Sequence, residues 1–192
     1  HVVPNGSGHL EGIVPTDPGL PGIGAGPAAP PFALAVGTLA AHKNLAPALH
    51  ALHARGIPTV VVGARGAGRV FAEASAALPP EGIVRYAGRL TDAQLGWLYR
   101  HAAVLVFPSR YEGFGVPLVE AQRLGCPVVA TTAASLPEVA GAGAILVDPD
   151  RPDELAESVA ELLASPHLRA TLAALGRANA ERYTWDRSAN LL

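Results

Sequence analysis

The sequence predicts an α/β fold built on a doubly wound parallel sheet of about six strands. From residue 32 onward, short apolar runs rich in β-branched residues alternate with amphipathic stretches. This alternation is typical of βα units whose helices cover both faces of a parallel sheet. The predicted strands are FALAVG (32–37), TVVVG (59–63), IVRYAG (83–88), AVLVFPS (103–109), PVVAT (127–131) and AILVD (144–148).

Helix signals fall between these strands. Thr91 and Gln94 have the spacing of a capping box, and Pro117 stands near the start of a helix that Gly125 follows. After the last strand, Asp150 and Ser165 are expected to precede two closing helices. These helices are DELAESVAELLAS (153–165) and PHLRATLAALGRANAERY (166–183), with Trp185 in a further short segment.

Residues 1–31 are expected to form an interdomain segment and a Gly/Pro-rich loop, and residues 32–192 a Rossmann-like domain. Gly22, Gly24 and Gly26 form a GxGxG pattern within the first part. Such a pattern indicates dinucleotide binding only between a strand and a helix. Here it follows no strand and opens no helix, so we interpret it as a flexible loop.

Composition limits the classes of function. The chain has 192 residues, 49% of them hydrophobic, which suffices for one core. A net charge of -2 with 16% charged residues argues against a nucleic-acid partner. The sequence has no apolar run of about 20 residues and no signal-peptide pattern at its start. Its lone cysteine, Cys126, is interpreted as a buried structural thiol. Because the chain starts at His1 and has no Met, we interpret it as a fragment.

Three of the loops that follow strands carry candidate ligand-binding groups, because ligands of open parallel sheets bind beyond the carboxyl ends of the strands. In GTLAAHKNL (37–45), Lys43 and backbone amides could hold a phosphate, although a lone lysine near a helix start is usually solvated. In GARGAG (63–68), the glycines allow either close approach of a ligand or a tight turn. In AGRLTDAQL (87–95), Leu90 and Asp92 could meet a nucleobase, or Asp92 could serve helix capping alone.

The fourth loop, from Ser109 to Ala130, is the most informative. If a helix starts near Pro117, the backbone amides of Gly113–Val116 lie at its entrance, where a negative ligand is favoured. Glu112 precedes this turn and Glu120 lies one turn inside the helix. We expect one carboxylate to accept sugar hydroxyls and the other ribose hydroxyls. The alternative for Glu120 is a residue that merely suits the helix dipole.

The segment YEGFGVPLVE, with its E-x7-E spacing around GFG, resembles the family 4 retaining glycosyltransferases. VVPNG (2–6) is similar to the opening of that family's C-terminal domain, VGTLAAHKN to its donor-phosphate loop, and YTWDRSANLL to its closing helix. The resemblance implies the Rossmann-like, donor-binding C-terminal half of a GT-B glycosyltransferase. By this resemblance Glu112 and Lys43 would be catalytic, and the donor-binding residues would be Gly37, Thr38, Lys43, Asn44, Leu90, Asp92, Glu112, Gly113, Phe114, Gly115, Val116 and Glu120.

The resemblance also implies a reaction. A hexose would move from a GDP- or UDP-sugar to a hydroxyl of a glycan or lipid-linked acceptor, with retained anomeric configuration and without a cofactor or metal. The phosphate loop carries the dipeptides Gly37-Thr38 (GT) and Lys43-Asn44 (KN). This variant favours GDP-mannose as the donor, hence a mannosyltransferase-like enzyme of bacterial glycan biosynthesis. Thr38 stands where many members have an arginine, so Lys43, Asn44 and helix-end amides would carry more of the diphosphate charge.

The missing N-terminal, acceptor-binding domain is expected to be required for transfer, so the fragment alone should bind its donor and remain inactive. We expect a cytoplasmic protein, peripheral to the inner face of the membrane through its missing half. Asp148 and Asp150 form a DxD pattern, but Pro149 lies between them, and we assign both to turn and capping roles. Alternative functions are a non-catalytic nucleotide-sugar-binding module and a GT-B-fold epimerase or phosphorylase, against which the E-x7-E segment argues.

Overall fold

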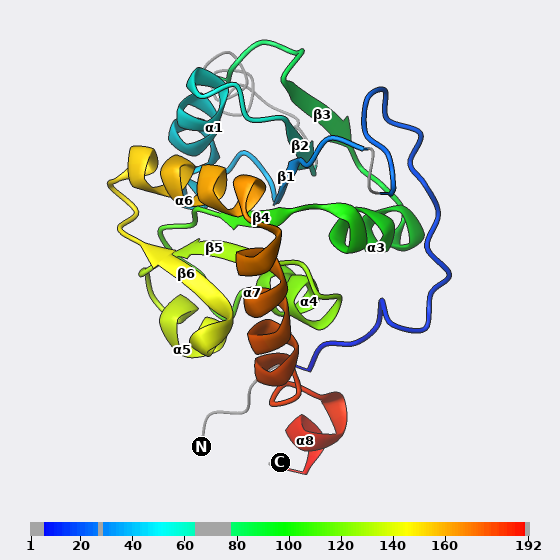
Figure 1. The fold of residues 1–192 in the computed structure, drawn as a ribbon. Coiled ribbons are helices and arrows are strands. Elements are labelled where there is room, and N and C mark those ends of the chain that lie inside the picture. The colour runs from blue at the N-terminus through cyan, green and yellow to red at the C-terminus, as the bar shows by residue number, and fades with distance from the viewer. Residues whose placement is uncertain (1–5, 27–28, 64–77, 191–192) are drawn as a thin grey trace.

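The computed structural model describes residues 6–26, 29–63 and 78–190. Within these ranges six strands form one parallel sheet in the order β3-β2-β1-β4-β5-β6 (Figure 1). The predicted doubly wound parallel sheet is therefore confirmed. The strands are β1 (Ala33–Val36), β2 (Thr59–Val62), β3 (Val84–Gly88), β4 (Val104–Phe107), β5 (Val128–Thr131) and β6 (Ala144–Val147).

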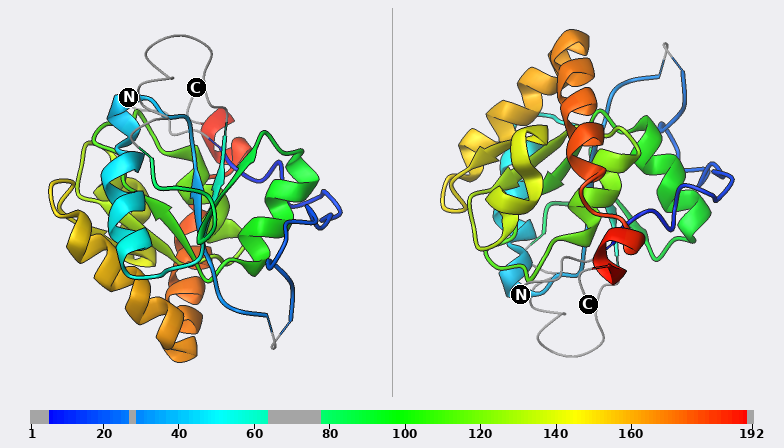
Figure 2. Two further views of the ribbon diagram at one scale, coloured as in Figure 1. Left: turned by 90° about the horizontal axis from the view of Figure 1, so that it is seen from above. Right: turned by 90° about the horizontal axis from the view of Figure 1, so that it is seen from below.

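Helices cover both faces of the sheet, as Figure 2 shows from above and below. Strand residues point alternately to the two faces. Leu34 and Leu105 contribute to the core beneath α3 and α4, whereas Ala35 and Val106 contribute to the core beneath α1 and α6. The helices are α1 (Leu45–Ala54), α3 (Asp92–His101), α4 (Val116–Arg123), α5 (Leu136–Ala140), α6 (Pro152–Ala164), α7 (Pro166–Ala180) and α8 (Trp185–Ala189), with short 3-10 turns η1 (Ala41–Lys43) and η2 (Gly141–Gly143).

The helix caps follow the sequence with one exception. Thr91 and Gln94 form the predicted capping box of α3, and the Ser165 hydroxyl accepts from the Leu168 amide at the start of α7. The prediction that Asp150 caps α6 is wrong, because Arg151 is the N-cap residue and makes no side-chain cap bond. Asp148 does form the expected turn, since its Oδ1 accepts from the Asp150 amide at 2.7 Å.

Residues 6–26 contain no regular helix or strand, yet they make specific contacts with the domain. The Thr16 amide donates to the Ala93 carbonyl of α3, and the segment runs past that helix before entering β1 (Figure 1). Ser7 donates through its amide to the Tyr183 carbonyl at 2.9 Å, beyond α7. Leu10 is 2% exposed and belongs to the core beneath α3 and α4. The start of this segment is thus fixed against the domain.

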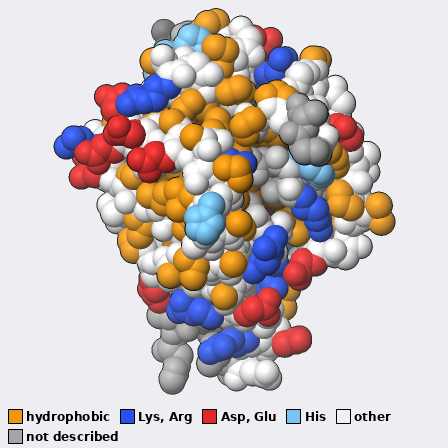
Figure 3. All heavy atoms as spheres, viewed as in Figure 1, with side chains coloured by type: hydrophobic (Ala, Val, Ile, Leu, Met, Phe, Trp, Pro, Cys, Tyr) orange, Lys and Arg blue, Asp and Glu red, His pale blue; other side chains and the backbone are white. Residues whose placement is uncertain are grey.

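The surface and the lone thiol agree with the composition. In the view of Figure 3, charged side chains of both signs are interspersed, without a field of one sign. Cys126 is buried as predicted, and desolvation raises the pKa of its thiol to about 12. None of the helices in the described ranges combines the length and the apolarity needed to span a membrane.

Candidate functional site

The carboxyl ends of β1 and β4 bring Lys43 and Glu112 together. These two strands are neighbours in the sheet, so the loops that follow them meet above it. Lys43 Nζ donates to Glu112 Oε1 at 2.6 Å, and the Ser109 hydroxyl donates to the same oxygen at 2.7 Å. The side chains of Lys43 and Glu112 are only 22% and 12% exposed. A fixed cation and a fixed carboxylate therefore stand side by side at the mouth of the sheet.

Asn44 holds the Lys43 loop to its neighbours. It adopts a left-handed backbone (φ 52) between η1 and α1, which asparagine tolerates better than most residues. Its Nδ2 donates to the Pro149 carbonyl at 3.1 Å, and its Oδ1 accepts from Arg110 Nε at 3.2 Å. Arg110 also pairs with Asp150 at 2.5 Å. Asn44 was predicted as a donor-binding residue, and in this structure its amide joins three loops.

The turn that opens α4 lies directly beyond Glu112. Gly115 is its N-cap residue with φ 94, a conformation that favours glycine, and an added Cβ would come within 3.0 Å of Leu136. Within the described ranges, none of the backbone amides of Gly113, Phe114 and Gly115 donates a hydrogen bond to another residue. Such amides at a helix N-terminus suit a negatively charged or hydroxyl-rich ligand.

Phe114 and Val116 flank this turn. The Phe114 ring packs edge-on against Tyr183, with ring centroids 5.2 Å apart, and both Phe114 and Val116 are partly buried. The Phe114 side chain therefore anchors the turn to Tyr183, while its backbone amide lies at the helix entrance.

Glu120 lies in a different environment from Glu112, one turn inside α4 and 7% exposed. Its Oε2 accepts a hydrogen bond from the Tyr99 hydroxyl of α3 at 3.1 Å, and His9 Nε2 lies 3.4 Å from its Oε1. Burial raises the pKa of the Glu120 carboxyl, and nearby Asp92 raises it further, while His9 and the Tyr99 hydrogen bond lower it. Burial and the Glu120 charge together raise the pKa of Tyr99 well above its usual value.

Arg123 fixes the segment that carries His9. It follows Glu120 by three positions, so the two side chains share a face of α4. Arg123 Nε donates to the Ser7 hydroxyl at 3.0 Å, and Nη1 lies 3.5 Å from Glu11. Nη2 donates to the carbonyl of Ala180 at the end of α7 (2.6 Å) and to that of Tyr183 beyond it (3.1 Å). His9 is therefore held over Glu120 by contacts on both sides of it.

The remaining predicted residues lie along the ends of β1 and β3. Leu90 is partly buried and packs against the core, whereas Asp92 and Thr38 are exposed. A cavity of about 520 Å³ opens between the ends of β1, β2 and β3. Its lining residues are Gly37, Leu39, Val61, Gly63, Glu81, Tyr86, Gly88 and Arg89. A Cβ at Gly63 would come within 2.0 Å of the Gly37 carbonyl oxygen, so the two glycines allow β1 and β2 to end in close contact.

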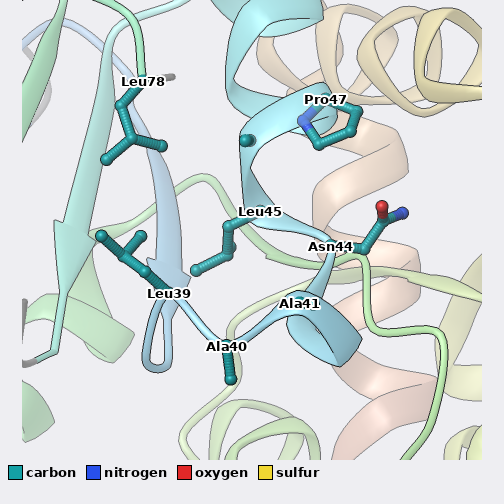
Figure 4. Close-up of a pocket in the computed structure, with 8 residues that line it drawn as sticks. Leu39, Ala40, Ala41, Asn44, Leu45, Pro47 and Leu78 are labelled. Carbon is teal, nitrogen blue, oxygen red and sulfur yellow. The ribbon is translucent and has the colours of Figure 1, made fainter. Parts of the chain in front are cut away.

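A smaller apolar cavity of about 180 Å³ lies on the other side of the Lys43 loop. Figure 4 shows the side chains of Leu39, Leu45 and Leu78 converging on it, while the amide of Asn44 points away. Gly63 of the predicted loop 63–68 lines the larger cavity. Residues 64–68 lie outside the described ranges, as do residues 2–5 of the segment VVPNG and residues 191–192 of the segment YTWDRSANLL.

Sequence reasoning missed several residues that shape the site, namely His9, Tyr99, Ser109, Arg110 and Arg123. Ser109 is the last residue of the predicted strand 103–109, and this position at the carboxyl end of a strand was a usable signal. Tyr99 lies in an apolar stretch of α3, and nothing in the sequence around it indicated a role in the site. In the portion of the chain that the structure describes, no three His, Cys, Asp or Glu side chains are grouped as metal ligands.

Comparison with known proteins defines the class. The model of the family described as "Glycosyl transferases group 1" matches residues 24–179. The chain belongs to this family. Its α/β fold agrees with that membership.

Individual relatives support this placement. O-antigen chain mannosyltransferase B from Escherichia coli is 33% identical over 162 residues, covering 81% of this chain and 42% of that protein. Sucrose-phosphate synthase from Thermosynechococcus elongatus has the same fold over 100% of this chain and 50% of its own, with a TM-score of 0.80 at 24% identity. The Anabaena protein HepE, solved in complex with UDP-glucose, covers 85% of this chain and 48% of its own, with a TM-score of 0.72 at 25% identity. The chain thus spans half or less of the length of these proteins.

Proposed function

We propose that this chain is the donor-binding domain of a family 4 retaining glycosyltransferase. In this proposal it holds a nucleoside diphosphate sugar, and a hexose is transferred to an acceptor hydroxyl with retained anomeric configuration. The observation that carries the proposal is the 2.6 Å contact between Lys43 and Glu112 beside the start of α4. It combines a cation suited to a diphosphate with a carboxylate suited to sugar hydroxyls.

The chemistry requires the bond between the anomeric carbon and the diphosphate oxygen to break while a bond to the acceptor oxygen forms. The nucleoside diphosphate leaves with the electron pair, and the proton of the acceptor hydroxyl passes to the departing diphosphate. Lys43 and the amides of Gly113, Phe114 and Gly115 would stabilise this negative charge through fixed dipoles and charge. Glu112 would orient the sugar, which makes the reacting geometry more frequent. No resident metal or cofactor is part of this proposal.

The nucleoside would occupy the other half of the site. Glu120 is assigned to the ribose hydroxyls, and the backbone of Leu90 to the base, with Asp92 as a further contact. The 520 Å³ cavity lined by Gly37 and Arg89 opens between the ends of β1, β2 and β3 and offers room for part of the nucleotide. HepE is a protein of similar fold whose solved complex contains UDP-glucose, which supports a nucleotide-sugar ligand for this chain.

GDP-mannose is the proposed donor. The GT and KN loop around Thr38 and Lys43 favours it, and the similarity to O-antigen chain mannosyltransferase B supports a mannosyl group. Transfer would further need an N-terminal, acceptor-binding domain, and an acceptor that is a glycan or a lipid-linked glycan. The proposed location is cytoplasmic, with membrane association through that other domain.

Calorimetric titration of the chain with GDP, UDP and ADP tests the donor site. We expect measurable binding of one diphosphate, with GDP tightest, and no release of GDP from GDP-mannose by the chain alone. Absence of binding to all three diphosphates would overturn the donor site. Preference for UDP or ADP would keep the site and reject GDP-mannose, while steady GDP release would reject the need for a second domain.

A further inference from the structure

Tyr99 and His9 contact the two oxygens of Glu120 and differ in how firmly they are held. Tyr99 is 0% exposed, and its hydroxyl lies inside the core beneath α3 and α4. The His9 side chain is 48% exposed, and its Nε2 is 3.4 Å from Glu120, longer than a good hydrogen bond. Glu120 thus has one rigid, buried partner and one partner at the surface.

The carboxylate of Glu120 retains capacity for a ligand. An ionised carboxylate offers about four acceptor positions. The Tyr99 hydroxyl fills one of them at Oε2, and His9 takes at most one at Oε1. About two positions remain, which matches the two hydroxyl donors of a ribose. Their direction depends on the rotation of the carboxylate about its last side-chain bond, and the Tyr99 hydrogen bond restricts that rotation.

We infer that Tyr99 is a positioning residue of the nucleoside subsite. Its hydroxyl holds Oε2 of Glu120 so that the carboxylate presents its remaining acceptor positions to both ribose hydroxyls of the donor. This inference rests on the proposed function, because it takes a nucleoside diphosphate as the ligand. It adds a means of discriminating ribose from sugars that lack these hydroxyls, through a residue that does not touch the ligand.

The test compares GDP with dideoxy-GDP, which lacks both ribose hydroxyls, on the wild-type chain and on Tyr99→Phe. The substitution removes one hydroxyl and keeps the ring. We expect Tyr99→Phe to weaken GDP binding by about fivefold to tenfold and dideoxy-GDP binding by less than about twofold, since only the hydroxyl contacts depend on Glu120. A role in packing alone would weaken both ligands equally and would overturn the inference.

Tyr183→Phe is the matched control. Tyr183 is also buried, and its hydroxyl donates to the Glu138 carbonyl at 3.2 Å instead of to Glu120. We expect this variant to keep the wild-type preference for GDP over dideoxy-GDP. An equal loss of preference in Tyr183→Phe and Tyr99→Phe would overturn the inference.

A second comparison tests whether Tyr99 acts through Glu120. In a Glu120→Ala background, which removes the carboxylate that Tyr99 holds, adding Tyr99→Phe should change GDP affinity by less than about twofold, because residues that act through one another are not additive. A full further loss in the double variant would overturn the inference. If the wild-type chain bound none of GDP, UDP and ADP, the proposed function itself would fail. Binding with unchanged preference in Tyr99→Phe would reject only the role of Tyr99.

Discussion

Glu112 and Glu120 belong to one short segment, yet the protein places them in opposite electrostatic environments. Glu112 has a lysine at 2.6 Å and a serine hydroxyl at 2.7 Å on the same oxygen. Glu120 is more deeply buried, and the nearest cationic candidate is the imidazole of His9 at 3.4 Å. The charge of Glu112 is therefore balanced within the protein, whereas that of Glu120 is only partly balanced.

This difference suggests separate tasks for the two carboxylates. A carboxylate that a lysine and a serine hydroxyl hold in place would suit the proposed role of orienting a sugar beside a diphosphate. A desolvated carboxylate gains more from new hydrogen bonds, because it has lost its bonds to water. Burial of Glu120 thus costs stability and would strengthen the proposed hydrogen bonds from the ribose hydroxyls. The following substitutions separate the two tasks.

The largest effect is expected for Lys43→Ala. This change removes the cation from the proposed diphosphate site and leaves Glu112 without its charged partner. We expect GDP affinity to fall by about tenfold to a hundredfold, because charge-assisted hydrogen bonds contribute about 1.5–3 kcal/mol each. Calorimetry measures the loss. Arg55→Ala is the control, since Arg55 is a cation at the end of α1 that pairs with Asp153. Similar losses in both variants would mean that only general charge attraction was removed.

Glu120→Gln is expected to separate binding from stability. Glutamine keeps an oxygen that can accept from Tyr99 and removes a buried charge. We expect GDP affinity to fall by about tenfold, as charged hydrogen bonds to the ribose become neutral ones. The thermal unfolding midpoint should stay equal or rise, because the desolvation cost disappears. Glu112→Gln, in contrast, should lower the midpoint, since it leaves Lys43 without its anionic partner. A lower midpoint for Glu120→Gln would contradict the proposed difference between the environments of Glu112 and Glu120.

The pH dependence of binding should follow Glu120. Burial raises the pKa of this carboxyl, Asp92 adds to the rise, and His9 and Tyr99 oppose it. GDP binding should weaken as the pH falls from about 8 toward the ordinary carboxyl range near 4, because protonated Glu120 accepts fewer hydrogen bonds. Calorimetry across this range on wild type and Glu120→Gln measures it. A profile that Glu120→Gln left unchanged would assign the titration to another group.

The raised pKa of Glu120 makes folding stability depend on pH in the opposite direction to GDP binding. The folded state binds a proton more tightly at Glu120 than the unfolded chain does. Its contribution to stability is therefore fully present below the unfolded pKa and is lost as the pH rises through the folded pKa. Glu120→Gln should remove this part of the pH dependence of the unfolding free energy. A denaturant titration at several pH values tests it.

The fold was predictable because its signals are local. Each strand is a short β-branched run, and the cap of α3 is fixed by Thr91 and Gln94, only three positions apart. The meeting of Lys43 with Glu112 was also accessible, since both follow strands of a parallel sheet. What escaped prediction is long-range. Tyr99 and Glu120 come from two different helices, and their contact depends on how α3 and α4 pack.

The contacts of residues 6–26 were the least predictable. The segment has no periodicity, because its glycines and prolines favour turns. Its position depends on single polar contacts to distant residues, such as Arg123 with Ser7, which lie 116 positions apart. Neither a lone serine nor a lone arginine carries a local signal of such a partner. The contact of His9 with Glu120 follows from this anchoring and was hidden for the same reason.

Ser109→Ala should give the smallest effect and compares the hydroxyl partners of the two glutamates. The Ser109 hydroxyl donates to Glu112 as that of Tyr99 does to Glu120. Glu112 keeps Lys43 after the change, so the carboxylate remains fixed. We expect GDP-mannose affinity to fall by only about twofold to threefold, in line with one neutral hydrogen bond that has a stronger neighbour. Calorimetry with GDP-mannose measures it.

Ser158→Ala is the control for Ser109→Ala, because the Ser158 hydroxyl donates to the Glu154 carbonyl on the surface of α6. It should leave affinity unchanged. A loss of tenfold or more in Ser109→Ala would mean that Lys43 does not fix Glu112 by itself. Glu112 would then depend on its hydroxyl partner as Glu120 is inferred to depend on Tyr99. The contrast between a carboxylate held by a cation and one held by a phenol would disappear.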